Sequence, residues 1–149
     1  MWEEMIRDGT MPADINVRDS LFSNDYTALM FQAVDDDGTK EAMEWLLTRQ
    51  PPADVNLRNK EGKTALMYAF DRDDPDKVRL LLEYGADRNI PNKEGITPLQ
   101  EAKKSKRIEI IPVLESYFPD VSAAAIQERA AIARAKNEAY LSDVTMNTS

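Results

Sequence analysis

Short helical patterns of apolar residues alternate with polar turns along most of the chain. Leu66, Ala69 and Phe70 stand at positions i, i+3 and i+4, which is the spacing of one face of an α-helix. The segment 78–82 repeats this spacing with Val and two Leu, and Pro75 with the Asp residues before it suits the start of that second helix. The pattern therefore predicts a short helix, a turn and a longer helix, followed by a polar hairpin.

This helix pair occurs three times. Thr64 and Thr97 lie 33 residues apart, and so do Asn56 and Asn89. The first copy is less regular, because Thr27 precedes Thr64 by 37 residues and an insertion must lie between them. Units of this length cannot bury their apolar faces alone, so they stack into an elongated solenoid. We therefore predict an all-α fold of about three stacked repeats.

Both ends of the chain depart from the repeat. Residues 1–15 parallel the second half of a repeat, so we expect a half-repeat with one capping helix there. Residues 122–140 are rich in Ala, Glu, Gln, Arg and Lys, which predicts a long helix, and we expect a flexible tail after it. That helix either caps the third copy, which is the expectation we adopt, or docks elsewhere, or stays free. The predicted divisions are 1–119 for the repeat domain (half-repeat 1–15; repeats about 16–55, 56–88 and 89–119) and 120–149 for the C-terminal helix and tail.

Three motifs carry a family resemblance. The second copy has Gly-x-Thr-Ala-Leu at residues 62–66 and Leu-Leu-x-x-Gly-Ala-Asp-x-Asn at residues 81–89. The third copy has Gly-x-Thr-Pro-Leu at residues 95–99. With these motifs the chain resembles the ankyrin repeat, over about residues 12–118. The family usually has His after Thr-Pro-Leu, where this chain has Met30, Met67 and Gln100.

The resemblance implies a protein-binding surface. Ankyrin proteins usually meet their partners on a concave face, made of the hairpin fingers and the inner side of the short helices. Leu21 and Phe22 are large apolar residues near the tip of the longer first finger, so they either anchor a partner or pack on the half-repeat. Carried onto this sequence, the face comprises Leu21, Phe22, Asn24, Asp25, Tyr26, Asp35, Asp36, Lys60, Glu61, Lys63, Asp71, Arg72, Lys93, Glu94, Ile96 and Lys104.

The composition narrows the range of functions. The 149 residues include no Cys and no His, so the chain lacks thiolate metal ligands and the commonest general base. A net charge of −8 disfavours binding to nucleic acid, and no apolar run is long enough to span a membrane. The segment 33–44 approaches a calcium-binding loop but has Ala33 at the first ligand position. We therefore expect no enzyme, no metal and no cofactor, and we expect a cytoplasmic protein.

Charge is distributed unevenly over the predicted turns between the helices. The segments 35–37 and 71–76 are rich in Asp, whereas the equivalent segment 103–107 carries three Lys and one Arg. The acidic ridge over two repeats is either plain solvated surface or a site that steers a basic partner. Our leading hypothesis is a non-enzymatic inhibitor or immunity-like protein, monomeric when free, that blocks a basic partner protein. The alternative is a scaffold or adaptor subunit of a larger assembly that docks through the C-terminal helix.

Overall fold

The helices of the chain follow one another in pairs with short connections. A computed structural model describes residues 8, 14–18, 25–35, 39–70 and 73–147. The predicted half-repeat at residues 1–15 therefore lies almost wholly outside the described residues. The helices are α2 (Ala28–Val34), α3 (Lys40–Thr48), α4 (Ala65–Tyr68), α5 (Pro75–Glu83), α6 (Pro98–Lys104), α7 (Ile110–Ser116) and α8 (Ala123–Asn147).

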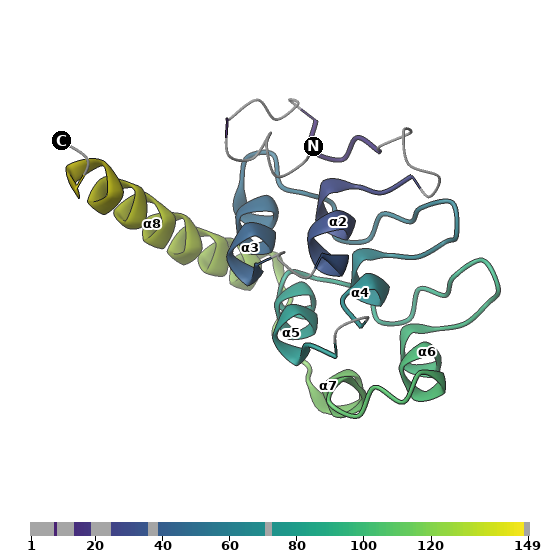
Figure 1. Ribbon diagram of the computed structural model, residues 1–149. Helices are drawn as coiled ribbons and strands as arrows, with labels where there is room; N and C mark the ends of the chain where they lie inside the picture. The colour runs from purple at the N-terminus through teal and green to yellow at the C-terminus, as the bar shows by residue number, and fades with distance from the viewer. Residues whose placement is uncertain (1–7, 9–13, 19–24, 36–38, 71–72, 148–149) are drawn as a thin grey trace.

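The helix pairs stack in two rows, which confirms the predicted all-α solenoid. Helices α2, α4 and α6 form an inner row, and α3, α5 and α7 form an outer row (Figure 1). Within each repeat the inner helix packs against its outer partner, and each helix also packs against the equivalent helix of the next repeat. The hairpin fingers extend from the inner row, on the side away from α8 (Figure 1).

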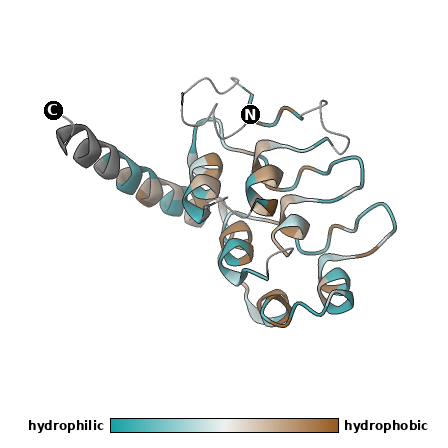
Figure 2. Cartoon of the chain, in the orientation of Figure 1, coloured by the Kyte–Doolittle hydropathy of each residue, from teal (hydrophilic) through white to brown (hydrophobic). Residues whose placement is uncertain are grey.

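The core lies between the two rows and follows from the helical spacing of apolar residues. Leu46, Leu66 and Leu81 are fully buried, as are Val78 and Ile110. Figure 2 shows hydrophobic residues on the helices, whereas much of the second and third fingers, residues 58–63 and 91–96, is hydrophilic. Each repeat thus covers the apolar flank of its neighbour, as a solenoid requires.

Threonine and aspartate side chains fix where several helices begin. The hydroxyl of Thr27 accepts a hydrogen bond from the backbone N–H of Met30 at the start of α2. At α5 the carboxylate of Asp74 caps the helix and Pro75 occupies the first turn, as the sequence predicted. These caps satisfy backbone donors that have no partner inside the helix.

Asparagine side chains connect successive repeats. The carboxamide oxygen of Asn16 accepts from the N–H of Asp54 at 2.7 Å. One repeat further on, Asn56 accepts from the N–H of Asp87 at 2.8 Å and donates to the carbonyl of Gly85 at 3.2 Å. The hydrogen-bonded ladder between repeats therefore rests on the recurring Asp-x-Asn motif.

Helix α8 lies against the first and second repeats, so our expectation that it caps the third copy is wrong. It packs on α3, with Ala130 and Ala133 buried. Arg129 donates to the carbonyl of Glu83 at the end of α5, at 2.7 Å, and Arg134 donates to the carbonyl of Thr48 at the end of α3, at 2.9 Å. Carbonyls at a helix C-terminus lack an intrahelical partner, and a guanidinium supplies one.

The long helix also extends further than predicted. It continues to Asn147, although we expected a flexible tail from Ser142 onward. The reason is that residues 123–147 contain no Gly and no Pro, so nothing in the sequence interrupts a helix there. Its last turns project beyond the stack of repeats (Figure 1).

Candidate functional site

The second and third fingers are hairpins organised around equivalent asparagines. In the second finger, residues 58–63, the N–H of Asn59 donates to the carbonyl of Lys63 at 3.0 Å. The side-chain oxygen of Asn59 accepts from the N–H groups of Glu61 and Lys63. The third finger, residues 91–96, has the same set of bonds around Asn92. Each turn is therefore held by its own side chain as well as by its backbone.

The two fingers are also bonded to each other. The N–H of Lys93 donates to the carbonyl of Glu61 at 3.0 Å. Arg58 donates from Nε to the carbonyl of Gly62 at 3.1 Å and from Nη2 to the carbonyl of Pro91 at 3.0 Å, so one side chain bridges both fingers. The backbone of this surface is consequently fixed before any partner arrives.

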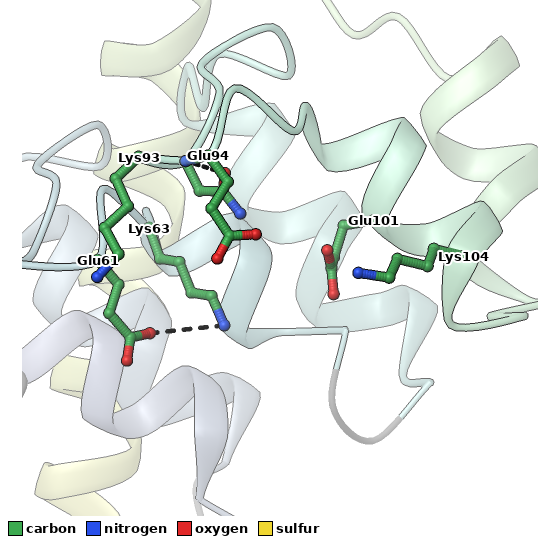
Figure 3. A pocket seen from close by; sticks show the side chains of 7 residues that line it. Glu61, Lys63, Lys93, Glu94, Glu101 and Lys104 are labelled. Atoms are coloured by element: carbon green, nitrogen blue, oxygen red, sulfur yellow. Dashed lines mark hydrogen bonds and ion pairs between the residues drawn. The ribbon is translucent and has the colours of Figure 1, made fainter.

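A cleft of about 300 Å³, which we call the finger cleft, lies between these fingers and α6. In Figure 3 the side chains of Glu101 and Lys104 from α6 face those carried by the fingers. The finger cleft is lined by Glu61, Lys63, Asn92, Lys93, Glu94, Glu101 and Lys104.

Five of these seven lining residues were predicted for the concave face, and Asn92 and Glu101 were missed. Both had a signal in the sequence. Asn92 begins a second copy of the Asn-Lys-Glu-Gly run that starts at Asn59. Glu101 precedes Lys104 by three positions on α6, so the two side chains share one helix face.

Some charged side chains of the finger cleft form ion pairs within the chain and others do not. Lys63 lies 3.6 Å from the carboxylate of Glu61 and 5.5 Å from the ring centroid of Tyr68. In contrast, Lys93 and Lys104 form no ion pair with any residue in the described part of the chain, and neither does Glu94. These three groups can therefore exchange water for a partner's charged atoms.

A buried tyrosine on α4, Tyr68, supports the second finger. Asn59 donates to the hydroxyl of Tyr68 at 2.7 Å, and burial raises the pKa of Tyr68. The ring of Tyr26 packs against that of Tyr68 with centroids 4.9 Å apart. Tyr26, predicted as a binding residue, thus has a packing role in this structure.

The remaining predicted residues lie away from the finger cleft. Lys60 is at 4.0 Å from Asp25, beside the fingers. Asp35 is half-buried at the end of α2, where its carbonyl accepts from Lys77 Nζ at 3.1 Å. Ile96 is half-buried at the base of the third finger. Other predicted residues fall outside the described part of the chain: Leu21, Phe22, Asn24, Asp36, Asp71 and Arg72.

Two aspartates of the acidic ridge, Asp74 and Asp76, take part in the start of α5. The carboxylate of Asp74 caps α5 by accepting from the N–H of Asp76, and Asp76 itself pairs with Arg79 at 3.1 Å. Much of this charge therefore stabilises the start of a helix, whose positive end favours carboxylates.

Two classes of site have no support among the described residues. No group of three or more His, Cys, Asp or Glu in that part of the chain is arranged to hold a metal ion. Within the same residues, no helix is both long and apolar enough to cross a membrane.

Comparison with known proteins identifies the family of these repeats. A family model described as ankyrin repeats (3 copies) matches residues 4–89 and 29–125. The chain belongs to the ankyrin-repeat family. The resemblance found in the sequence and the stacked fold are thereby confirmed. Ankyrin repeats are protein–protein interaction modules and generally have no catalytic activity, so this chain is a protein-interaction domain.

Curated relatives share the repeats over part of their length. The human BCL-6 corepressor-like protein 1 is 32% identical over 109 residues, which is 71% of this chain and 6% of the relative. A putative ankyrin repeat protein of Acanthamoeba polyphaga mimivirus is 35% identical over 66 residues, 44% of this chain and 9% of the relative. A putative ankyrin repeat protein of Rickettsia bellii is 40% identical over 48 residues, 32% of this chain and 29% of the relative. The chain thus spans less than a third of the length of each.

Proposed function

We propose that this ankyrin domain is an inhibitor that blocks a basic protein partner through the finger cleft. The observation that carries the proposal is a cleft with charged side chains that form no ion pair within the described part of the chain, beside fingers that are already bonded to each other, on a chain whose net charge is −8. A rigid surface loses little conformational entropy when it binds, so its contacts translate efficiently into affinity.

The overall charge and the cleft make different contributions to this proposal. The chain carries a net charge of −8, which steers a basic partner toward it during encounter. The finger cleft itself is balanced, with three Glu and three Lys among its lining residues. It therefore suits a partner surface that presents both a basic and an acidic group, and such a pattern orients the bound partner.

Capture of the partner tests the proposal directly. We expect affinity purification followed by mass spectrometry to yield a basic protein whose activity falls when one equivalent of this chain is added. The dissociation constant, measured by calorimetry, should rise between about 0.1 and about 1 M salt, where the Debye length falls from about 10 to about 3 Å. An acidic partner, or an affinity unchanged by salt, would contradict the proposal.

A pair of variants locates the surface. Glu94→Gln combined with Glu101→Gln should weaken partner binding about tenfold, because each removes a charge from the finger cleft. Glu109→Gln combined with Glu128→Gln is the matched control, since it also removes two charges, and both residues are exposed and do not line the cleft. Equal effects of the two changes would mean that only the overall charge matters.

A scaffold or adaptor role is the second candidate, and the course of α8 favours it. The last turns of α8 project beyond the repeats (Figure 1), and Ile132 is 56% exposed on that helix. Light scattering coupled to size-exclusion chromatography separates the two functions. The inhibitor should elute as a monomer when free, whereas the scaffold should oligomerise or co-purify with other subunits. A cytoplasmic location stays a prediction under either function.

A further inference from the structure

The third finger has an open edge where the second finger has a neighbour. The N–H of Lys93 donates to the carbonyl of Glu61, so the third finger bonds to the edge of the second that faces away from the first repeat. A Cβ atom at Gly62 would lie 2.5 Å from the backbone nitrogen of Lys93, whereas no described atom lies within 4 Å at the equivalent Gly95. In Figure 1 the third finger is accordingly the last of the row. We call its open side the distal edge.

Two backbone carbonyls of the third finger lack the donors that their counterparts have. In the second finger the carbonyl of Glu61 accepts from the third finger, and the carbonyl of Gly62 accepts from Nε of Arg58 at 3.1 Å. The equivalent carbonyls, 33 residues further on, are those of Glu94 and Gly95. Neither has a hydrogen-bond partner among the described residues. Both residues are exposed, so these two acceptors are accessible to a ligand.

The counterparts in the second finger show which donors would complete the distal edge. A main-chain N–H bonds to Glu61, so a main-chain N–H suits the carbonyl of Glu94. A guanidinium bonds to Gly62, so an arginine suits the carbonyl of Gly95. The third repeat cannot supply that arginine itself, because Pro91 occupies the position equivalent to 58 and proline has no hydrogen-bond donor.

The preference for arginine rests on hydrogen-bond geometry. Lys93 stands next to Glu94, so the charges on the finger nearly cancel. A guanidinium presents several donors in one plane, which a lysine ammonium does not. The net charge of −8 adds a general attraction for a basic segment.

We infer that an extended segment of the basic partner docks along the distal edge, in the place that a fourth finger would take. A main-chain N–H of that segment donates to the carbonyl of Glu94, and an arginine side chain donates to the carbonyl of Gly95. Main-chain pairing at an exposed edge is a common way to bind an extended peptide. The inference rests on the proposed function for the basic character of the partner. It extends the finger cleft, which Glu94 also lines, to the end of the finger row.

A peptide library tests the distal edge without the natural partner. The probe is a phage-displayed library of random dodecapeptides, selected on the whole chain. We expect the enriched peptides to contain arginine more often than lysine. A synthetic copy of one should shift the carbonyl NMR signals of Glu94 and Gly95 in a saturable way and leave those of Glu61 and Gly62 unchanged. No enriched peptide, or unshifted signals at Glu94 and Gly95, would overturn the inference.

A glycine substitution blocks the distal edge. Gly95→Asn introduces a Cβ atom with little strain, because asparagine tolerates the left-handed backbone that Gly95 adopts at φ +79°. We expect the peptide to bind about tenfold more weakly, since the added atoms overpack its contact. Gly85→Asn is the matched control, because Gly85 also has positive φ, +90°, and follows α5, away from the fingers. Equal affinities of the native chain and Gly95→Asn would contradict the inference.

A second substitution supplies the missing donor from the chain itself. Pro91→Arg gives the third finger the side chain that the second finger has at Arg58, and its Nε competes with the peptide for the carbonyl of Gly95. We expect the affinity for the peptide to fall about threefold through loss of one hydrogen bond. Pro91→Lys adds the same charge without the planar donors, so its effect should be smaller. Equal losses in the two variants would refute the role of arginine.

The failure of this inference is distinguishable from the failure of the proposed function. If a basic partner is captured and inhibited but binds the native chain and Gly95→Asn equally, the inference alone fails. If arginine peptides bind at the distal edge and no basic partner is captured, the proposed inhibitor function fails and the peptide site stands.

Discussion

The second and third repeats share a finger but differ in how the rest of each repeat is held. Both fingers contain Asn-Lys-Glu-Gly, at residues 59–62 and 92–95, and both glycines have positive φ, +73° for Gly62 and +79° for Gly95. The inner helices, however, are unlike. Helix α4 has four residues, all of them buried, whereas α6 has seven residues, of which only Pro98 and Ala102 are buried.

The less buried inner helix, α6, has the more complete N-terminal cap. Helix α6 begins with a complete capping box, in which Thr97 and Gln100 each bond to the other's backbone N–H. Thr64, at the equivalent position before α4, makes no capping bond, and its hydroxyl is buried without a partner. An internal repeat is thus held mainly by its neighbours on both sides, and the third repeat depends more on local bonds. Matched substitutions at equivalent positions test this contrast.

The largest difference is expected for the leucines of the inner helices. Leu66→Ala should lower the free energy of unfolding by about 3 kcal/mol, since Leu66 is fully buried and its loss leaves a cavity. Leu99→Ala should cost about 1 kcal/mol, because the equivalent Leu99 is only half-buried. Urea unfolding of both variants checks the ratio. Equal losses would mean that the third repeat is packed as tightly as the second.

The next largest difference in stability is expected between substitutions of the two finger glycines, Gly62 and Gly95. A methyl group at Gly62 would lie 2.5 Å from the backbone nitrogen of Lys93 and 2.8 Å from Nη2 of Arg58, whereas nothing lies within 4 Å at Gly95. Positive φ costs each alanine about 1 kcal/mol, and overpacking adds about 1 kcal/mol or more at Gly62 only. Thermal unfolding of Gly62→Ala and Gly95→Ala measures the difference. If the two melting temperatures fall equally, the fingers are not in close contact.

The ladder asparagines provide a smaller contrast. Asn56→Ala removes two hydrogen bonds to the neighbouring repeat and should cost about 1–2 kcal/mol. Asn89→Ala should change stability by only a few tenths of a kcal/mol, since the side chain of Asn89 is exposed and bonds to no described residue. Hydrogen exchange at the amide of Asp87 should accelerate in Asn56→Ala alone. Protection that persists there would show that the backbone holds the junction without the side chain.

The sequence was sufficient for the features that repeat. The 33-residue period predicted the stacked helix pairs, and the resemblance to the ankyrin repeat placed Glu61, Lys63 and Lys93 on one concave face, where they line one cleft. Such positions are determined by local pattern, because the same offset in each repeat leads to the same place in the stack.

Features that occur once were harder to predict. The partners of Arg129 and Arg134 are backbone carbonyls, and every residue has one, so no residue type marks the acceptor. The narrow Ala stripe of α8 likewise fits against many helices, which is why its position on α3 could not be deduced. Asn56 was recognised as a repeated residue, but its bonds to the next repeat depend on the stacking distance, which the sequence does not contain.

In the last comparison we expect the larger loss of stability in the third repeat and not in the second. Thr97→Ala should cost about 1 kcal/mol, since it removes the capping bond to Gln100 at the start of α6. Thr64→Val should leave stability unchanged or raise it by up to about 1 kcal/mol, because it replaces a buried hydroxyl that has no partner with a methyl group of similar shape. Urea unfolding of both variants decides the point. A loss in Thr64→Val as large as that in Thr97→Ala would mean that the Thr64 hydroxyl bonds in solution, and that local capping supports the internal repeat as well.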